Sequence, residues 1–423
     1  MDKTRNEELT KKRWLVLLAS CLINLCIGSL YAWSVFATPL ADRLNDLMGN
    51  GGKVLLTAAN LGIVFTVANS VGPITMISGG AMNEKLGMKK VVFIGGLLFG
   101  CGLLGSSFAS SIPALILFYG LGCGLGMGMV YGCTISNSVK FFPDKRGLIG
   151  GIATATYGLS SVLIPPIANQ MIQRLGVEKT LLVLGIVFLV LICLCSFLID
   201  SCPADFLPTN GWKPKENTSL VKRQDYKWNQ MLKDKRFYLM LLMLLCGAFS
   251  GLMITSQASP MAQKMAGMTA AKAATAVSIL ALFNAAGRIL SGYLSDKLGR
   301  SKVLIMAFVL ELMGLFSLLN VKEGDEILFY LGLSIMGFCF GSFMGIYPGF
   351  TADQFGAKNN GVNYGIMFIG FALAGFFGPT VVGKIVNTYG SYQKGFFVAM
   401  GTVCVGIILS FVFSVIEENR LRK

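Results

Sequence analysis

The sequence predicts an all-α membrane protein with the fold of two pseudo-symmetric six-helix bundles, twelve transmembrane helices in all. Three observations support this fold class. The chain is 54% hydrophobic and only 13% charged, with a mean hydropathy of +0.66. Its apolar runs are long enough to cross a bilayer, and the same loop pattern recurs half a chain apart. A soluble protein could not bury this much apolar surface, so the bilayer must be its solvent.

The apolar runs give the expected helices in order. Each has about 20 or more mainly apolar residues and can cross a hydrocarbon core of about 30 Å as an α-helix. In the first half they cover 14–36, 54–79, 91–109, 112–139, 147–172 and 178–199. In the second half they cover 237–262, 271–294, 301–320, 327–350, 361–386 and 393–416. The first run is too long for a signal peptide and lacks a clear cleavage site, so it is interpreted as the first span.

Between the two sets lies the longest polar stretch, residues 200–236, which is rich in Lys, Asp, Asn and Pro. This composition is typical of a linker. We therefore expect an N-terminal bundle over 1–199, a cytoplasmic linker over 200–236 and a C-terminal bundle over 237–423. The end of the linker, 228–237, is amphipathic and basic, which predicts a short helix on the inner membrane surface.

The 36 Lys and Arg residues are concentrated in alternate loops and at both ends of the chain. By the positive-inside rule this distribution places both termini in the cytoplasm and the protein in the cytoplasmic (inner) membrane. The same distribution argues against nucleic acid as a partner, because no basic domain stands apart from the spans. The expected partners are the lipid bilayer and a small carboxylate substrate, with the monomer as the functional unit.

Residue usage excludes several kinds of chemistry. The chain has no histidine, and its eleven cysteines lie mostly within apolar runs, with no CxxC pair. Histidine-based metal sites and Ser-His catalysis are therefore excluded, and neither a metal nor a cofactor is expected. Paired carboxylates and nucleophile–base pairs at matching depths are missing as well, so the protein is not expected to be an enzyme.

Arg288 lies within the apolar stretch 271–294. The charged turn that begins at Asp296 should mark the membrane surface, which puts Arg288 about 12 Å deep at a rise of about 1.5 Å per residue. A cation there costs at least about 2.5–3.5 kcal/mol unless water, a partner or an anion faces it. One turn earlier stands Asn284, a further candidate residue of the substrate site, and not an acid. A ligand that brings its own negative charge explains this residue best, and this points to a carrier of small organic anions.

A charged loop motif follows the second and the eighth predicted helix. Two parallel six-helix repeats with a binding site at the membrane midplane are typical of a rocking transporter. The residues of the motif in the two copies are Gly80, Glu84, Lys85 and Gly87, and Gly292, Asp296, Lys297, Gly299 and Arg300.

The GxxxDKxGR pattern at 292–300 resembles the signature cytoplasmic loops of the major facilitator superfamily, and the resemblance covers the whole chain. Its carboxylate can accept hydrogen bonds from a neighbouring helix N-terminus and so form a latch that holds one access state. The alternative is that both loops are only tight, positive turns that fix the topology. The first copy departs from the pattern, with Glu84 in place of Asp and Met88 in place of Arg.

Further segments are similar to the oxalate/formate antiporter family, which is related to the monocarboxylate porters. They are Tyr31-Ala-Trp33 to Pro39, Tyr131 to Gly147, Tyr157-Gly158, Asn363-Tyr364-Gly365 and Asn284-x-x-x-Arg288. The resemblance implies that Arg288 binds the substrate carboxylate and that Tyr31, Tyr131 and Tyr157 line the cavity. Packing or interfacial anchoring is the alternative for the tyrosines.

One departure bears on the substrate. Oxalate carriers place a lysine on the eleventh helix, and the corresponding residue here is Phe371. Neighbouring candidates are also aromatic: Phe368, Phe340 and Tyr347. One cation among apolar side chains suits a monocarboxylate such as lactate, pyruvate or formate better than a dianion. Oxalate/formate exchange remains the nearest alternative, and a carboxylate-binding membrane sensor is an alternative of another class.

The coupling mode stays open between proton symport and anion exchange. Related monocarboxylate porters have an aspartate where this chain has Asn284, which cannot titrate. Glu311, inside the ninth predicted helix, is the candidate proton site. The alternative is that it forms a hydrogen bond between helices.

Overall fold

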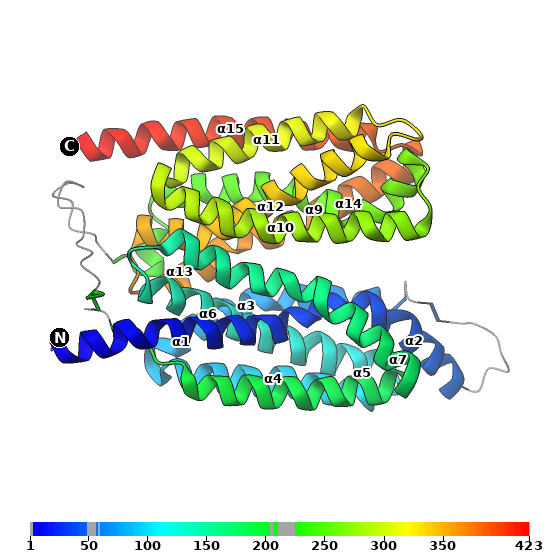
Figure 1. Ribbon diagram of the computed structural model, residues 1–423, viewed down its shortest axis with the longest axis horizontal. Coiled ribbons are helices and arrows are strands. Elements are labelled where there is room, and N and C mark those ends of the chain that lie inside the picture. Colours follow the sequence, from blue (N-terminus) through cyan, green and yellow to red (C-terminus); the bar gives the residue numbers. More distant parts are fainter. Residues whose placement is uncertain (1–2, 49–55, 58–59, 204–205, 210–224, 423) are drawn as a thin grey trace. The chain divides into compact units, whose positions relative to one another are not determined.

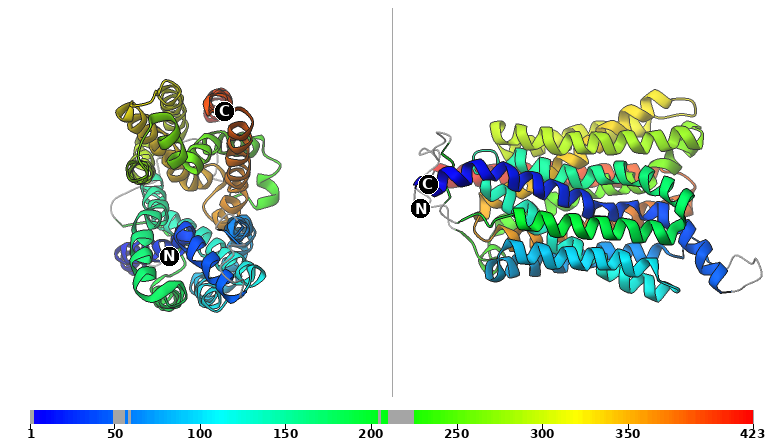
Figure 2. Two further views of the ribbon diagram at one scale, coloured as in Figure 1. Left: turned by 90° about the vertical axis from the view of Figure 1, so that its right-hand side faces the viewer. Right: turned by 60° about the horizontal axis from the view of Figure 1, so that its bottom comes forward.

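The computed structural model is built almost entirely of helices that run side by side (Figure 1). It describes residues 3–48, 56–57, 60–203, 206–209 and 225–422, and no strand occurs in these ranges. The helices pack in two compact units, and within each unit they run along one common direction (Figure 2).

The first unit comprises residues 1–141 and 156–207. Its core consists of apolar side chains that face inward from each span, whereas many other apolar side chains on the same helices stay exposed, as a lipid-facing surface requires. Its elements are α1 (Lys3–Ile27), η1 (Gly28–Ala32), α2 (Trp33–Leu47), α3 (Gly62–Leu86), α4 (Met88–Ser107), α5 (Ile112–Leu115), η2 (Ile116–Cys123), α6 (Gly124–Phe141) and most of α7 (Arg146–Leu198).

The second unit comprises residues 142–155 and 208–423. It therefore includes the first residues of α7, which pack against α10 and α12, whereas the rest of α7 belongs to the first unit. Its further elements are α8 (Trp228–Met231), α9 (Lys235–Ala266), α10 (Ala270–Leu298), α11 (Arg300–Leu319), α12 (Glu326–Phe355), α13 (Asn360–Met367), α14 (Ile369–Tyr389) and α15 (Gln393–Arg422).

Eleven stretches of the described residues are long and apolar enough to cross a membrane. The longest is α7, and its Gly176 has a non-helical backbone with φ 79° and ψ 166°. The parts before and after Gly176 are each long enough to span, so the helices account for the twelve predicted spans. The predicted break between 172 and 178 falls at this glycine.

Two predicted boundaries are wrong. The first span does not end near residue 36: after the short 3₁₀ segment η1 the helix resumes and continues through Pro39 to Leu47. The extension is amphipathic, with Leu40, Ala41 and Leu44 buried. Its hydropathy is therefore too low for the segment to be predicted as part of the span. The second span begins at Gly62 and not at residue 54.

The predicted short helix over 228–237 is also shorter than expected. The short helix is Trp228–Met231, and a turn separates it from α9, which begins at Lys235. The turn ends where the side chain of Asp234 caps α9 by accepting a hydrogen bond from the amide of Arg236 at 2.9 Å. Residues 210–224 of the predicted linker lie outside the described part of the chain.

The two copies of the loop motif have the same backbone geometry. Gly87 ends α3 with φ 81° and ψ 160°, and Gly299 ends α10 with φ 94° and ψ 150°. A positive φ at the end of a helix favours glycine, which has no Cβ to clash. In both copies the next helix begins with the following residue.

Candidate functional site

Arg288 is 6% exposed on α10. Its Nε donates to Oδ1 of Asn284 at 2.9 Å, and its Nη1 donates to the carbonyl oxygen of Thr154 at 2.6 Å. Thr154 lies in the first part of α7, which belongs to the same unit. No carboxylate of the described residues forms an ion pair with Arg288. The expectation that this guanidinium lacks a protein counter-ion therefore holds for the described part of the chain.

Neutral oxygens orient the guanidinium without cancelling its charge. A guanidinium is a planar fork of donors that matches the two oxygens of a carboxylate, and such charge-assisted pairs are stronger than neutral hydrogen bonds. Asn284 uses its side-chain oxygen to hold Arg288. The structure thus supports a positioning role for Asn284. The sequence contained no signal for the Thr154 carbonyl, because any residue offers one.

Glycines fix the helix that carries Arg288. A Cβ at Gly341 or Gly345 of α12 would collide with backbone atoms of Asn284 and Arg288. A Cβ at Gly151 of α7 would collide with the carbonyl oxygen of Arg288. The three helices therefore meet backbone to backbone, as small residues at four-residue spacing allow. This close packing leaves the Cα of Arg288 little freedom.

The three predicted tyrosines come together in the first unit. The ring centroid of Tyr157 lies 5.3 Å from that of Tyr31 and 4.7 Å from that of Tyr131. Phe65 of α3, which the sequence did not indicate, lies 6.3 Å from Tyr31. Tyr131 and Tyr157 are buried and Tyr31 is half-buried. The grouping depends on Gly28, because a Cβ there would collide with the backbone of Tyr157.

Three of the four candidate aromatic residues of the second unit form a stack. Phe371 lies nearly parallel to Phe340, with centroids 6.3 Å apart and an interplanar angle of 7°. Phe368 also stacks on Phe371, and their ring centroids are 4.6 Å apart. Phe340 directly precedes Gly341, which packs on the backbone of Asn284. The three rings form an apolar wall, here called the phenylalanine wall.

Tyr347 is not part of this wall. It is 1% exposed, and its hydroxyl donates to the carbonyl oxygen of Met240 in α9 at 2.7 Å. Its ring contacts Phe350 edge to face. These contacts give Tyr347 a packing role between α12 and α9, and its contact with substrate stays a prediction.

Asp296 in the second copy of the loop motif caps α7. Its two carboxylate oxygens accept hydrogen bonds from the amides of Gly147 and Leu148 at 2.8 and 2.9 Å. The first amides of a helix lack partners within the helix and carry the positive end of its dipole, so a carboxylate is favoured there. This is the arrangement expected for the motif. Gly147 has to be small, because a Cβ would collide with Gly292 and Arg300.

Asp353, near the end of α12, is a member of the same cluster that the sequence did not reveal. Its Oδ1 accepts from Nη1 of Arg146 at 2.7 Å, and its Oδ2 accepts from Nε of Arg300 at 3.0 Å. Arg300 also pairs with Asp296 at 2.7 Å. Buried Arg146, half-buried Arg300 and the two carboxylates thus compensate one another.

The first copy of the motif is built differently. Gly80 is buried, Lys85 is exposed, and the side chain of Glu84 lies outside the described residues. Here Asp200 pairs with Lys12 and with Lys89. Burial raises the pKa of Asp200, but the two ammonium groups outweigh it, so the pKa ends below its ordinary value. In the second copy, the Lys297 ammonium lies 4.4 Å from the ring centroid of Tyr293.

Glu311 of α11 is fully buried and accepts a hydrogen bond from Ser250 of α9.

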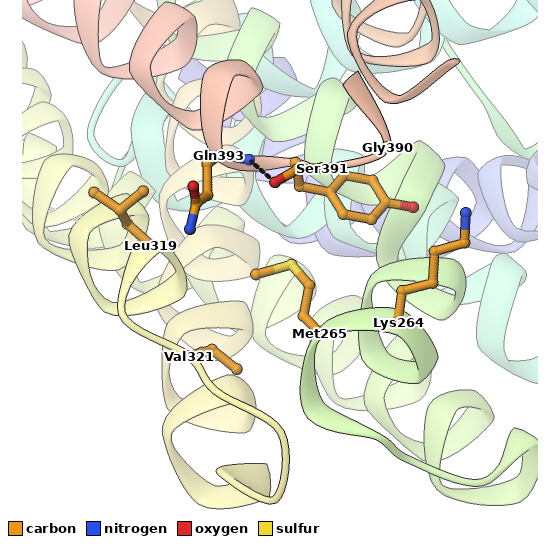
Figure 3. A pocket seen from close by; sticks show the side chains of 8 residues that line it. Lys264, Met265, Leu319, Val321, Gly390, Ser391 and Gln393 are labelled. Carbon is orange, nitrogen blue, oxygen red and sulfur yellow. Dashed lines mark hydrogen bonds between the residues drawn. The ribbon is translucent and has the colours of Figure 1, made fainter. Parts of the chain in front are cut away.

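A separate hollow of about 150 Å³ lies at the opposite end of the second unit from Asp296 and is drawn in Figure 3. None of the predicted site residues lines it. Its lining residues are Lys264, Met265, Leu319, Val321, Gly390, Ser391, Tyr392 and Gln393.

The sequence matches the Major Facilitator Superfamily over residues 13–379 and 266–422. The chain belongs to this superfamily. It is therefore a multi-span membrane transporter, and the predicted fold class is confirmed.

Several curated relatives are similar to this chain over most of its length. The chain is 28% identical over 363 residues to the uncharacterized MFS-type transporter YhjX of Escherichia coli, covering 86% of each. It is 27% identical over 383 residues to the oxalate:formate antiporter of Oxalobacter formigenes, covering 90% of this chain and 87% of the relative. It is 25% identical over 365 residues to monocarboxylate transporter 12-B of Danio rerio, covering 80% and 76%.

Among solved structures, the proton:xylose symporter XylE bound to 6-bromo-6-deoxy-D-glucose matches with a TM-score of 0.74 and 15% identity. The match covers 95% of each chain. At this identity the likeness concerns the fold alone, which is that of the major facilitator superfamily.

The glycine packing around α10 gives a first prediction. Gly345→Ala places a methyl group against the Arg288 backbone, so it should lower the apparent unfolding temperature of the purified protein, in line with overpacking costs of about 1–3 kcal/mol. The control is Gly401→Ala in α15, where no atom lies within 4 Å of the added Cβ. It should leave the protein as stable or stabilise it, because alanine favours helix. Equal unfolding temperatures for the two variants would refute the packing argument.

Proposed function

We propose that the protein is a secondary carrier of small monocarboxylates such as lactate, pyruvate or formate. It works as a monomer in the inner membrane, with both termini in the cytoplasm, and by alternating access. The single observation that carries this proposal is the buried Arg288, whose protein partners among the described residues are the neutral oxygens of Asn284 and Thr154.

Charge balance favours an anion as cargo. Arg288 is cationic at membrane depth, and such a group is stable only with a counter-charge, water or a polar partner. A substrate carboxylate supplies the counter-charge and fits the donor fork. The similarity to an oxalate:formate antiporter and to monocarboxylate transporters supports the same substrate class. A cationic or neutral cargo would leave the guanidinium charge without compensation.

The phenylalanine wall favours one carboxylate with a short apolar tail. Phe371 stands where oxalate carriers place a second cation, and it is stacked between Phe340 and Phe368. The second charge of oxalate would meet aromatic carbon there and would remain without a partner. The tyrosine cluster of the first unit is a further candidate contact surface, because its hydroxyls can donate to a carboxylate.

Alternating access requires a change in the charged cluster of Arg146, Asp296, Arg300 and Asp353, which is expected on the cytoplasmic side. The Asp296 cap on Gly147 and Leu148 and the pairing of Asp353 with Arg146 hold the start of α7 in the second unit. We expect these contacts to be released when the substrate site opens to the cytoplasm. The cluster would then act as the gate and Arg288 as the binding group.

Replacement of Arg288 tests the proposal. In proteoliposomes, Arg288→Ala should reduce uptake of labelled lactate or pyruvate by about 10- to 100-fold, because a charge-assisted interaction worth about 1.5–3 kcal/mol is lost. Arg288→Lys should also fail, since a point charge cannot replace the fork. Arg174→Ala, at an exposed arginine of α7, is the control and should transport normally. Undiminished uptake by Arg288→Ala would disprove the assigned role.

The choice between monocarboxylate and oxalate can be tested at Phe371. Phe371→Lys should strengthen inhibition of lactate uptake by oxalate about tenfold or more, since it supplies a second cation for the dianion. Phe371→Leu controls for the loss of stacking and should not strengthen it. If oxalate already competes with wild-type uptake as strongly as unlabelled lactate does, oxalate/formate exchange is the better assignment.

A further inference from the structure

Glu311 is a carboxyl group without a cationic partner in the core of the second unit. It lies near the middle of α11 and is 0% exposed. One oxygen, Oε1, accepts a hydrogen bond from the hydroxyl of Ser250. The other, Oε2, is buried and has no hydrogen-bond partner. In the described part of the chain, no lysine or arginine forms an ion pair with this group.

Its surroundings come from the helices that pack against α11. Cys246 lies one turn before Ser250 on α9, and Cys339 lies on α12 immediately before Phe340. Neither thiol supplies a positive charge. From α15, the contact with α11 near its start is made by Glu417, which accepts from Ser301 and lies at the cytoplasmic end of the helix. From α10, the Arg288 guanidinium is bound to Asn284 and Thr154 and not to Glu311.

An ionised carboxylate in such a site would be expensive. Low dielectric surroundings penalise the charge, and one oxygen has no donor to compensate it. A neutral carboxylic acid removes the charge, which is the larger penalty, and its carbonyl oxygen can still accept the hydrogen bond from Ser250. The side chain is therefore expected to hold a proton in this conformation.

The hydrogen-bond partner of the carboxyl group, Ser250, lies next to the phenylalanine wall along α9. Ser250 is followed by Gly251, and a Cβ at Gly251 would collide with the ring of Phe340. Cys339 immediately precedes Phe340 on α12. Any shift of α12 against α9 during the change of access therefore alters the packing around the carboxyl group. Binding and release of the proton can in this way follow the movement that exposes the substrate.

We infer that Glu311, oriented by Ser250, binds the proton of a proton–monocarboxylate symport, and this inference rests on the function proposed above. One proton enters the carboxyl group on the outer side for each anion bound, and both leave to the cytoplasm. The charges of proton and anion cancel, so each cycle is electroneutral. Glu311 then supplies the titratable group that Asn284 cannot provide.

Two assays on reconstituted protein separate coupling from substrate binding. One measures accumulation of labelled lactate driven by an inward proton gradient, and the other measures lactate–lactate exchange at equal pH. Glu311→Gln keeps a hydrogen-bond acceptor for Ser250 but cannot titrate. It should lose gradient-driven accumulation at least tenfold and keep exchange within about twofold. Glu323→Gln, at an exposed glutamate of the α11–α12 loop, is the matched control and should behave as wild type in both assays.

The outcomes are distinguishable. Gradient-driven accumulation by Glu311→Gln at the wild-type level would overturn the inference, and so would loss of both activities in a folded variant, which would mean a structural role. If Glu311→Gln does not fold, Glu311→Asp keeps the titratable group with a shorter reach and should shift the pH of half-maximal uptake; an unchanged pH would contradict the inference. If the wild-type protein exchanges lactate but does not accumulate it in response to the proton gradient, the inferred proton coupling is disproved and the carrier function stands. Failure of both assays in the wild type would instead disprove the carrier function.

Discussion

Arg288 is buried in the second unit, and its hydrogen-bond partners among the described residues are two neutral oxygens, so its positive charge is the constraint on which the rest of this unit depends. A buried cation is costly at membrane depth, and no carboxylate of the described residues forms an ion pair with it. The hydrogen bonds to Asn284 and Thr154 fix the orientation of the guanidinium. A side chain oriented so firmly and left with its charge uncompensated is suited to a ligand that arrives as an anion.

The backbone around Arg288 follows from the same constraint. Gly341, Gly345 and Gly151 let α12 and α7 approach α10 until main chains touch. The first part of α7 is further held by Asp296, which caps it, and by Asp353, which pairs with Arg146. Thus the segment whose Thr154 carbonyl accepts a hydrogen bond from Arg288 is also the segment held by Asp296 and Asp353. Under the proposed function, release of these contacts would also loosen the hold on Arg288.

The sequence predicted the spans well because the bilayer imposes a simple rule, namely that every crossing segment needs a long apolar run. It failed where that rule does not apply. The helix beyond Pro39 is amphipathic and was missed, and the π-helical segment Ile116–Cys123 has no hydropathy signature. The turn after α8 depends on the cap at Asp234, which hydropathy does not report.

The site was predictable in part for a similar reason. A lone arginine in an apolar run can be recognised from the sequence alone, and the tyrosines and phenylalanines were predicted from the family resemblance. Which of them meet could not be read from the sequence, because Tyr347 and Phe340 lie on one helix and only Phe340 joins the wall. Asp353 was missed because its partners Arg146 and Arg300 come from other helices.

The most direct test of the central claim compares an anion with its neutral isostere. The apparent unfolding temperature of the purified protein would be measured with lactate and with lactamide at equal concentrations. If the cargo supplies the missing counter-charge of Arg288, lactate raises the unfolding temperature and lactamide does not, and Arg288→Ala abolishes the difference. Equal stabilisation by lactate and lactamide would contradict the account, because the charge of the ligand would then be irrelevant to binding.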